Sequence, residues 1–174
     1  MRNKDYLLDT NIAGYLVELK SGKLTEKCKN LQGHLENISA DAKLFVSSIS
    51  IGELHYGFQV APSHMKDDIK KLCDYFINNL DIIILDVNEN TARDYYATIR
   101  AKLFNQYSPK DGRKKKRPEE WENPSDSKSL TIQENDIWIS AIAQNYNLIL
   151  VSNDKMNAIK AVVGADLDCE DWLS

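Results

Sequence analysis

Apolar residues occur along this chain in two alternating kinds of run. The short continuous runs, which are typical of buried strands, lie at residues 5–9, 44–47, 81–85 and 147–152. Longer stretches, in which apolar residues recur every three or four positions as on one helical face, lie at residues 24–38, 63–80, 89–104 and 135–145. Because strands alternate with helices, the pattern predicts a three-layer α/β/α fold whose central sheet of four to five strands is mostly parallel.

Several shorter elements are less strongly marked. A helix is expected from about Asn11, and Ser50 is a candidate N-cap for a helix that carries Glu53. Residues 154–165 predict a helix or a turn, and residues 165–173 predict a weak final strand. The run at 81–85 is continuously apolar and rich in β-branched residues, which predicts a strand covered on both faces.

One segment, at about residues 105–130, breaks the alternation. It contains three of the four prolines and no apolar periodicity. It also carries a run of five cations: Arg113, Lys114, Lys115, Lys116 and Arg117. We interpret it as a loop insertion on the surface of a single domain that spans residues 1–174.

Composition narrows the class of protein. The chain has 174 residues, of which 43% are hydrophobic and 28% charged, as in a soluble globular domain with a sizeable core. The three dispersed cysteines indicate neither a disulfide framework nor a zinc site, and no apolar stretch is long enough to span a membrane, so we expect a cytoplasmic protein. The net charge of −4 means that any contact with nucleic acid must come from local basic clusters.

Four acidic residues lie where an apolar run meets the start of a predicted helix. Asp9 and Asp154 follow strand-like runs, and Glu53 and Asp136 begin amphipathic helices. In an open α/β sheet such positions converge on the crevice beyond the carboxyl ends of the strands. Four carboxylates at close range repel one another unless a cation is present, and hard oxygen ligands suit Mg²⁺ or Mn²⁺. The arrangement is that of a metal-dependent nuclease.

Each acid also has an ordinary structural explanation. Ser50 and Glu53 have the spacing of a capping box, and a carboxylate at any helix start is favoured by the helix dipole. Capping does not call for the small polar residues around the acids, which could orient metal ligands by hydrogen bonding. Those residues are Thr10, Asn11, Ser47, Ser50, Asn135, Ser152 and Asn153.

The local motifs, taken in order, resemble a known family. They are DTN after an apolar strand, S-x-I-S-x-x-E-L, N-D-x-W-I-x-A-x-A and L-V-S-N-D, with EDW near the end of the chain. Together they are similar to the PIN domain, and within it to the VapC-like toxin ribonucleases of bacterial toxin–antitoxin systems. The resemblance covers about residues 1–104 and 131–174, and NDIWISAIA is its most specific part.

The resemblance implies a fold, an activity and partners. Asp9, Glu53, Asp136 and Asp154 would hold Mg²⁺ or Mn²⁺ and form the catalytic group for hydrolysis of an RNA phosphodiester. Thr10 and Asn135 would support the site, and Asn153 is the alternative to Asp154. The expected partners are an RNA substrate, a cognate antitoxin protein and a second copy of the chain in a homodimer. The cations at 113–117 are candidates for contact with the RNA backbone.

Two other classes fit the sequence less well. A phosphatase of the haloacid dehalogenase type also begins with an aspartate after a strand, but it needs a second aspartate where this chain has Asn11. A PIN-like module that binds RNA or protein, with weak or no nuclease activity, is the remaining alternative. The histidines at 34, 55 and 64 lack the spacing of metal ligands.

Overall fold

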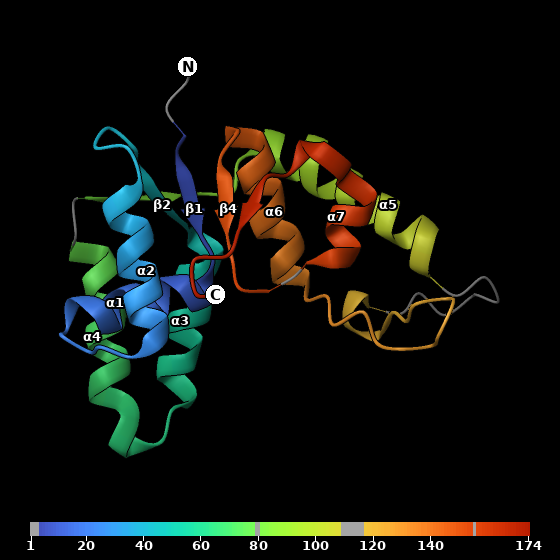
Figure 1. Ribbon diagram of the computed structural model, residues 1–174. Coiled ribbons are helices and arrows are strands. Elements are labelled where there is room, and N and C mark those ends of the chain that lie inside the picture. The colour runs from blue at the N-terminus through green and yellow to red at the C-terminus, as the bar shows by residue number, and fades with distance from the viewer. Residues whose placement is uncertain (1–3, 79–80, 109–116, 155) are drawn as a thin grey trace. The chain divides into compact units, whose positions relative to one another are not determined.

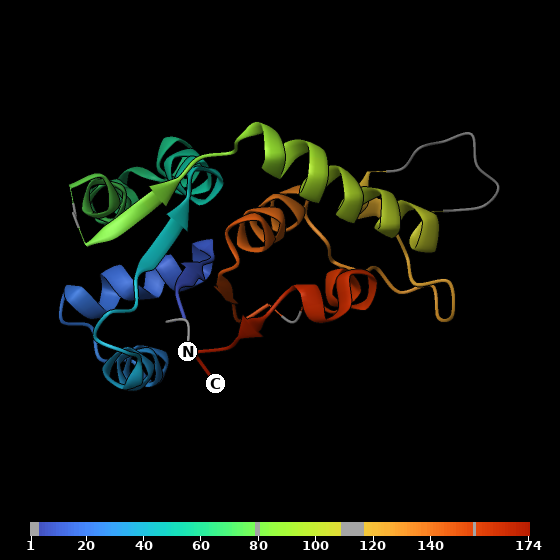
Figure 2. The same ribbon diagram turned by 90° about the horizontal axis from the view of Figure 1, so that it is seen from above.

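Five strands form the sheet in this computed structural model (Figure 1). The strands are β1 (Tyr6–Leu8), β2 (Leu44–Ser47), β3 (Ile82–Leu85), β4 (Ile149–Val151) and β5 (Cys169–Glu170). Their order is β3-β2-β1-β4-β5, and every neighbouring pair is parallel. Figure 2 shows β2 and β3 side by side and pointing the same way. The predicted α/β fold with a mostly parallel sheet of four to five strands is confirmed.

The structure describes residues 4–78, 81–108, 117–154 and 156–174. They divide into two compact units: Met1–Asp86 with Leu148–Asp154 and Asp168–Ser174, and Val87–Asn147 with Lys155–Leu167. The first unit holds the sheet and the helices α1 (Thr10–Lys20), α2 (Glu26–Asn37), α3 (Ser48–Val60), η1 (Ser63–Met65) and α4 (Lys66–Asn78). The second unit holds η2 (Thr91–Tyr96), α5 (Ala97–Tyr107), η3 (Pro118–Glu120), α6 (Glu134–Tyr146), α7 (Asn157–Val163) and η4 (Gly164–Asp166).

The core of the first unit lies between the sheet and its helices. Tyr6 and Leu8 on β1 pack into it together with Leu16 of α1, Leu31 of α2 and Phe76 of α4. Successive side chains of a strand point to opposite faces. All three residues of β1 are buried, so both faces of this central strand are covered. The carboxyl end of β1 is therefore held firmly in the interior.

The prediction that β3 is covered on both faces is wrong. Ile82 is buried, but Ile83 and Ile84 are 41% and 39% exposed. The reason is the position of β3 at the edge of the sheet, where it has a neighbouring strand on one side only. A continuous apolar run does not by itself distinguish a central strand from an edge strand.

The start of α3 differs from the prediction by one turn. Ser47 is the N-cap, because its hydroxyl oxygen accepts a hydrogen bond from the Ser50 amide at 2.9 Å. Ser50 is buried inside the helix, and its hydroxyl lies 2.9 Å from that of Ser47. Glu53 consequently lies in the second turn of α3 rather than in a capping box with Ser50. The capping explanation for Glu53 does not hold.

The second unit begins with an irregular helix. Where the sequence predicts one amphipathic helix over 89–104, the structure has the π-helix η2 followed by α5. The Asn88 side-chain oxygen accepts hydrogen bonds from the Thr91 amide at 2.8 Å and from its hydroxyl at 3.0 Å. The wider helix is thus anchored at its start by a side chain.

Part of the segment at 105–130 is folded. Helix α5 continues to Tyr107, and η3 is followed by Trp121, which is 1% exposed. The Trp121 ring meets Phe104 of α5 edge-on, with the ring centroids 6.2 Å apart. Its carbonyl accepts a hydrogen bond from the Leu130 amide at 3.1 Å. Buried contacts of one large side chain can hold an aperiodic segment in place, and periodicity cannot detect them.

None of the helices in the described ranges combines the length and the apolar character that crossing a membrane requires.

Candidate active site

Asp9 lies where β1 ends and α1 begins. Its side chain is 4% exposed, and Oδ1 accepts a hydrogen bond from the Ile12 amide at 2.8 Å. Oδ2 accepts a hydrogen bond from the Ser152 hydroxyl. Asp9 is therefore the N-cap of α1, as one of the structural explanations allowed. A helix cap does not need to be buried. Capping explains the hydrogen bond of Oδ1 but neither the burial of the carboxylate nor the contact of Oδ2.

The second oxygen is held from the neighbouring strand. Strand β4 pairs with β1, and the Asp9 amide donates to the Val151 carbonyl at 3.0 Å. Ser152, the next residue, is buried beside Asp9, and its hydroxyl oxygen also accepts a hydrogen bond from the Asp154 amide at 3.0 Å. Ser152 thus links the Asp9 carboxylate to the turn that carries Asp154. Asp154 is exposed in this turn and does not begin a helix as predicted, because α7 starts only at Asn157.

Asn153 lies between these two residues. Its side-chain oxygen Oδ1 is buried and has no hydrogen-bond partner among the described residues. A buried polar atom without a partner costs about 1–3 kcal/mol. An uncompensated oxygen at the carboxyl end of a central strand is suited to a ligand that supplies positive charge or a hydrogen-bond donor.

Glu53 joins the site through Thr10. The Thr10 hydroxyl donates a hydrogen bond to Oε2 of Glu53, across 43 residues of sequence. Thr10 directly follows Asp9, so this bond places Glu53 of α3 against the first turn of α1. Thr10 and Ser152, both predicted as companions of the acids, each bind one carboxylate of the first unit.

Asp136 belongs to the second unit, in the first turn of α6. Its Oδ2 accepts a hydrogen bond from the Gln133 amide at 2.9 Å, which completes a capping box at the helix start. Asn135, the other predicted residue of this helix, is half-buried beside it. The role of Asp136 as a metal ligand stays a prediction from the family resemblance.

Aromatic and charged groups surround the start of α6. Trp138 stacks on Tyr96 with the ring centroids 3.6 Å apart. Tyr96 donates its hydroxyl hydrogen to Glu134, which also forms an ion pair with Arg100 at 2.5 Å. Burial raises the pKa of the Glu134 carboxyl. These contacts fix the first turn of α6, and with it the backbone that carries Asp136.

The chemistry of the first-unit donors fits a hard divalent cation. Carboxylate and amide oxygens of Asp9, Glu53, Asn153 and Asp154 are the kinds of ligand that Mg²⁺ and Mn²⁺ accept. The partnerless oxygen of Asn153 is the feature of the structure that a bound ion would satisfy. Within the described ranges, however, no three side chains of Asp, Glu, His or Cys are grouped as they would be around one ion.

Most of the predicted basic run lies outside the described residues. This applies to Arg113, Lys114, Lys115 and Lys116, whereas Arg117 is described and exposed. The Arg117 amide donates to the Glu120 carboxylate at 3.1 Å at the start of η3. Contact of this run with RNA stays a prediction.

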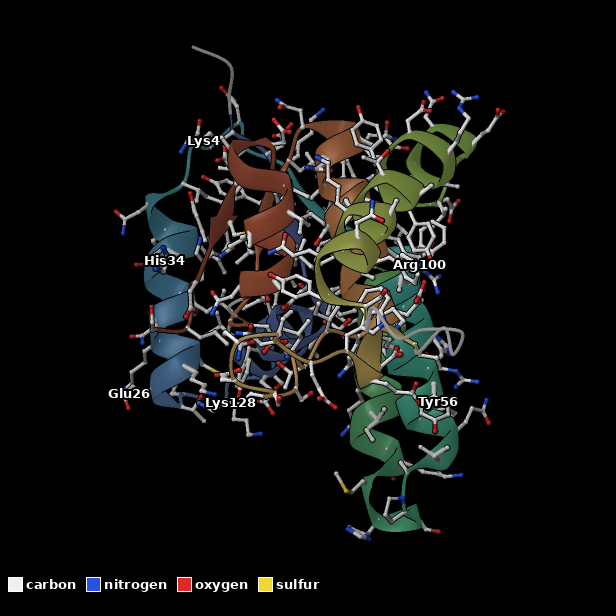
Figure 3. All side chains as sticks on the ribbon, turned by 90° about the vertical axis from the view of Figure 1, so that its right-hand side faces the viewer. Lys4, Glu26, His34, Tyr56, Arg100 and Lys128 are labelled. Carbon is white, nitrogen blue, oxygen red and sulfur yellow. The ribbon has the colours of Figure 1, made fainter. Side chains whose placement is uncertain are left out.

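A cleft that sequence reasoning missed lies against α1. It has a volume of about 640 Å³, and we call it the α1 cleft. It is lined by Thr10, Asn11, Gly14, Tyr15, Glu18, Lys23, Thr25, Glu26, Lys27 and Leu54. Figure 3 labels Glu26, which begins α2. The signal in the sequence was a polar stripe on α1, which the buried residues Ile12, Ala13 and Leu16 leave on the opposite side.

Comparison with known proteins agrees with the fold and gives the family. Residues 6–162 match the family model of the PIN domain. Ribonuclease VapC2 of Haemophilus influenzae is 27% identical over 168 residues, which are 97% of this chain and 98% of that protein. The chain therefore belongs to the PIN domain family. Within this family it is VapC-like, as the order of its motifs predicted.

Solved structures show the same fold at lower identity. VapBC-1 of nontypeable Haemophilus influenzae has a TM-score of 0.65 at 20% identity, covering 97% of this chain and 98% of that one. VapBC2 of Rickettsia felis, solved with a DNA fragment from its promoter, has a TM-score of 0.63 at 22% identity, with coverages of 96% and 98%. VapBC-5, from a toxin–antitoxin system of Mycobacterium tuberculosis, has a TM-score of 0.58 at 19% identity, with the same coverages.

Proposed function

We propose that this protein is a Mg²⁺- or Mn²⁺-dependent endoribonuclease that hydrolyses RNA phosphodiesters, and that it is the toxin of a toxin–antitoxin pair. The observation that carries the proposal is the Asp9 carboxylate, which is buried at the carboxyl end of β1 and held by Ser152. The adjacent bond between Thr10 and Glu53 supplies a second carboxylate. The names of the VapC relatives support ribonuclease chemistry.

In this proposal the metal is held by Asp9, Glu53, Asp136 and Asp154. The chemistry that such an ion would supply is polarisation of the phosphate and activation of a water molecule for hydrolysis. The chain's own hydroxyl groups prepare the ligands: Ser152 holds Asp9, and Thr10 holds Glu53. Asn135 and Asn153 are supporting residues, and the side-chain oxygen of Asn153, which has no hydrogen-bond partner in the described part of the chain, is available to the ion or its water.

We further propose that a cognate antitoxin protein blocks the site and that the chain forms a homodimer in the cytoplasm. The similar VapBC structures support an antitoxin partner. A carboxylate-rich site suits an arginine of the partner, whose guanidinium pairs with a carboxylate through two hydrogen bonds. Growth arrest on expression alone, relieved by co-expression of a small co-encoded protein, tests the toxin role. Light scattering at micromolar concentration tests the dimer, and a monomer contradicts it.

A role in binding alone is the second candidate. It is favoured by one observation, the lack of three grouped metal-binding side chains in the described ranges. On this alternative the chain would bind RNA or protein without cutting RNA. The two candidates differ in what the purified protein does to RNA when Mn²⁺ is added.

The experiment is an RNA cleavage assay with matched variants. Wild-type protein is expected to cut RNA with Mg²⁺ or Mn²⁺ and to stop when EDTA removes the metal. Asp9→Asn should fall to background while keeping the fold, because asparagine caps a helix as well as aspartate does but binds a hard cation poorly. Asp41→Asn, an exposed aspartate of the same unit, is the control and should cut as the wild type does. Equal cleavage by Asp9→Asn, with contaminating nuclease excluded, would refute the nuclease.

A further inference from the structure

One face of α1 forms a polar stripe that runs away from the acids. Asn11, Gly14, Tyr15 and Glu18 have the spacing i, i+3, i+4 and i+7, which puts them on the same side of the helix. All four line the α1 cleft. The opposite side of the helix is used for the core, where Ile12, Ala13 and Leu16 are buried. Tyr15 packs against this core with part of its side chain but is only partly buried, so the rest of the side chain is open to the cleft.

The cleft begins at the proposed catalytic group. Thr10, its first lining residue, follows Asp9 and donates a hydrogen bond to Glu53. From Thr10 to Glu18 the helix rises about 12 Å. A substrate chain with one phosphate at the acids can therefore place an adjoining group along the stripe. Cavities of several hundred cubic ångströms are the usual size of ligand sites.

Tyr15 and Lys27 meet in this cleft. The Lys27 Nζ donates a hydrogen bond to the Tyr15 hydroxyl at 3.3 Å and lies 5.2 Å from the ring centroid. Because the nitrogen is closer to the hydroxyl than to the ring centre, it lies at the hydroxyl end and leaves the middle of the ring uncovered by Lys27. In the described part of the chain Lys27 forms no ion pair, whereas Lys23 is paired with Glu18 at 2.6 Å. The cleft thus offers the accessible part of the Tyr15 ring and one cation that is in no ion pair among the described residues, beside the carboxylate of Glu26.

We propose that the α1 cleft binds the nucleotide next to the cleaved bond of single-stranded RNA, with the base stacked on Tyr15 and a phosphate paired with Lys27. This proposal rests on the proposed ribonuclease function and adds a substrate contact to it. Stacking on an aromatic ring accepts any base, and a lysine binds phosphate as a point charge. Asn11 presents both a donor and an acceptor to the sugar or the base edge.

The lining favours RNA over a segment of a partner protein. Leu54 and the Tyr15 ring are the large apolar groups among the ten lining residues, and the others are polar, charged or glycine. A docked helix would need an apolar groove with several anchor positions. A nucleotide needs one flat ring, hydrogen-bonding groups and a cation, and the cleft has each of these.

The test measures binding without cleavage. Every variant is made in the full chain on the Asp9→Asn background, and a fluorescein-labelled 12-nucleotide RNA of mixed sequence is titrated in Mg²⁺ by fluorescence anisotropy. Tyr15→Ala should weaken binding roughly 5- to 100-fold, while Tyr15→Phe, which keeps the ring, should stay within about twofold of the parent. Lys27→Met should flatten the log–log salt dependence of binding by about 0.7.

Matched controls come from the same unit. Tyr56 projects from α3, as Figure 3 shows. It is 69% exposed and is not among the cleft residues. Tyr56→Ala and Lys29→Met, the latter on the exposed surface of α2, should bind RNA as the parent does. Circular dichroism spectra and melting temperatures of all variants are compared, so that a loss of binding is scored only in folded protein.

The outcomes separate this inference from the proposed function. If Tyr15→Ala binds RNA as tightly as the parent, the subsite is refuted even when wild-type protein cuts RNA. If Tyr15→Ala binds RNA as the parent does but no longer binds a co-encoded antitoxin, the cleft is a protein interface and the proposal is wrong. Equal losses in Tyr15→Phe and Tyr15→Ala refute stacking. If the wild-type protein does not cut RNA but Tyr15→Ala binds RNA more weakly than the parent, the nuclease function is refuted and the RNA-binding role of the cleft is supported.

Discussion

Ser152, at the end of β4, donates its hydroxyl hydrogen to the carboxylate of Asp9, at the end of β1. The two residues are 143 positions apart in the sequence and are joined by the parallel pairing of their strands. The same hydroxyl oxygen accepts a hydrogen bond from the Asp154 amide. One small buried side chain thus positions two of the proposed metal ligands.

Removing this hydroxyl should weaken metal binding. Ser152→Ala removes the hydrogen bonds that the hydroxyl makes with the Asp9 carboxylate and the Asp154 amide. Removing a hydrogen bond that orients a metal ligand typically lowers metal affinity about 10- to 100-fold. Stability should fall by about 1–3 kcal/mol. A titration of RNA cleavage against Mn²⁺ measures the first effect, and urea unfolding the second. Ser152→Thr keeps a hydroxyl and should recover much of the affinity, whereas an unchanged Mn²⁺ dependence in Ser152→Ala would show that the bond is only structural.

Asp136 allows capping and metal binding to be separated. Asp136→Asn keeps an oxygen that can accept a hydrogen bond from the Gln133 amide, so stability should fall by less than about 1 kcal/mol, the part due to the helix dipole. Asp136→Ala loses the capping box and should cost about 0.5–2 kcal/mol. Both variants should lose RNA cleavage if Asp136 is a metal ligand. If Asp136→Asn still cuts RNA and only the less stable Asp136→Ala loses activity, Asp136 acts only as part of the helix cap.

Trp121 should prove to be a structural residue of the segment at 105–130. It is 1% exposed and packs against Phe104, so Trp121→Ala should destabilise the protein by about 3–5 kcal/mol. Thermal unfolding followed by circular dichroism measures the change. Glu122→Ala, at the exposed neighbouring position, is the control and should stay within about 0.5 kcal/mol of the wild type. A small effect of Trp121→Ala would mean that the second unit does not depend on this segment.

The basic run should contribute to RNA affinity. Replacing residues 113–117 by serine removes five cations and should flatten the log–log salt dependence of RNA binding by about 0.7 for each phosphate that the run neutralises. Metal affinity should not change, because the run contains no carboxylate. Binding measured from low to moderate salt, on the Asp9→Asn background, checks the prediction. A slope equal to that of the parent would make the run a solvated loop.

Much of the fold follows from patterns that are local in the sequence. Continuous apolar runs predicted the strands. Apolar residues spaced three and four positions apart predicted α2 and α6, because this spacing reflects the geometry of a helix. The predicted start of α3 is wrong by one turn, since Ser47 and Ser50 are both good caps and only the backbone conformation decides between them. The exposure of Ile83 depends on strand order, which no local pattern contains.

The candidate site was predictable in part for the same reason. Asp9, Ser152 and Thr10 follow or adjoin strand ends, so their meeting follows from a parallel sheet. The bond from Thr10 to Glu53 spans two elements and needed the packing of α1 against α3. The α1 cleft cannot be predicted from the sequence, because Tyr15 and Lys27 lie on different helices and neither belongs to a distinctive motif.

The two roles of Asp9, as a helix cap and as a proposed metal ligand, have a consequence for how such a gene evolves. Its carboxylate is both the cap of α1 and, by our proposal, a ligand at the centre of the chemistry. Most replacements there would remove the cap as well and lower the yield of folded chain. Asp9→Asn is the exception, because asparagine is an equally good cap and the two amino acids are a single base change apart. A lineage burdened by the activity therefore has a short mutational path to a silent, well-folded descendant.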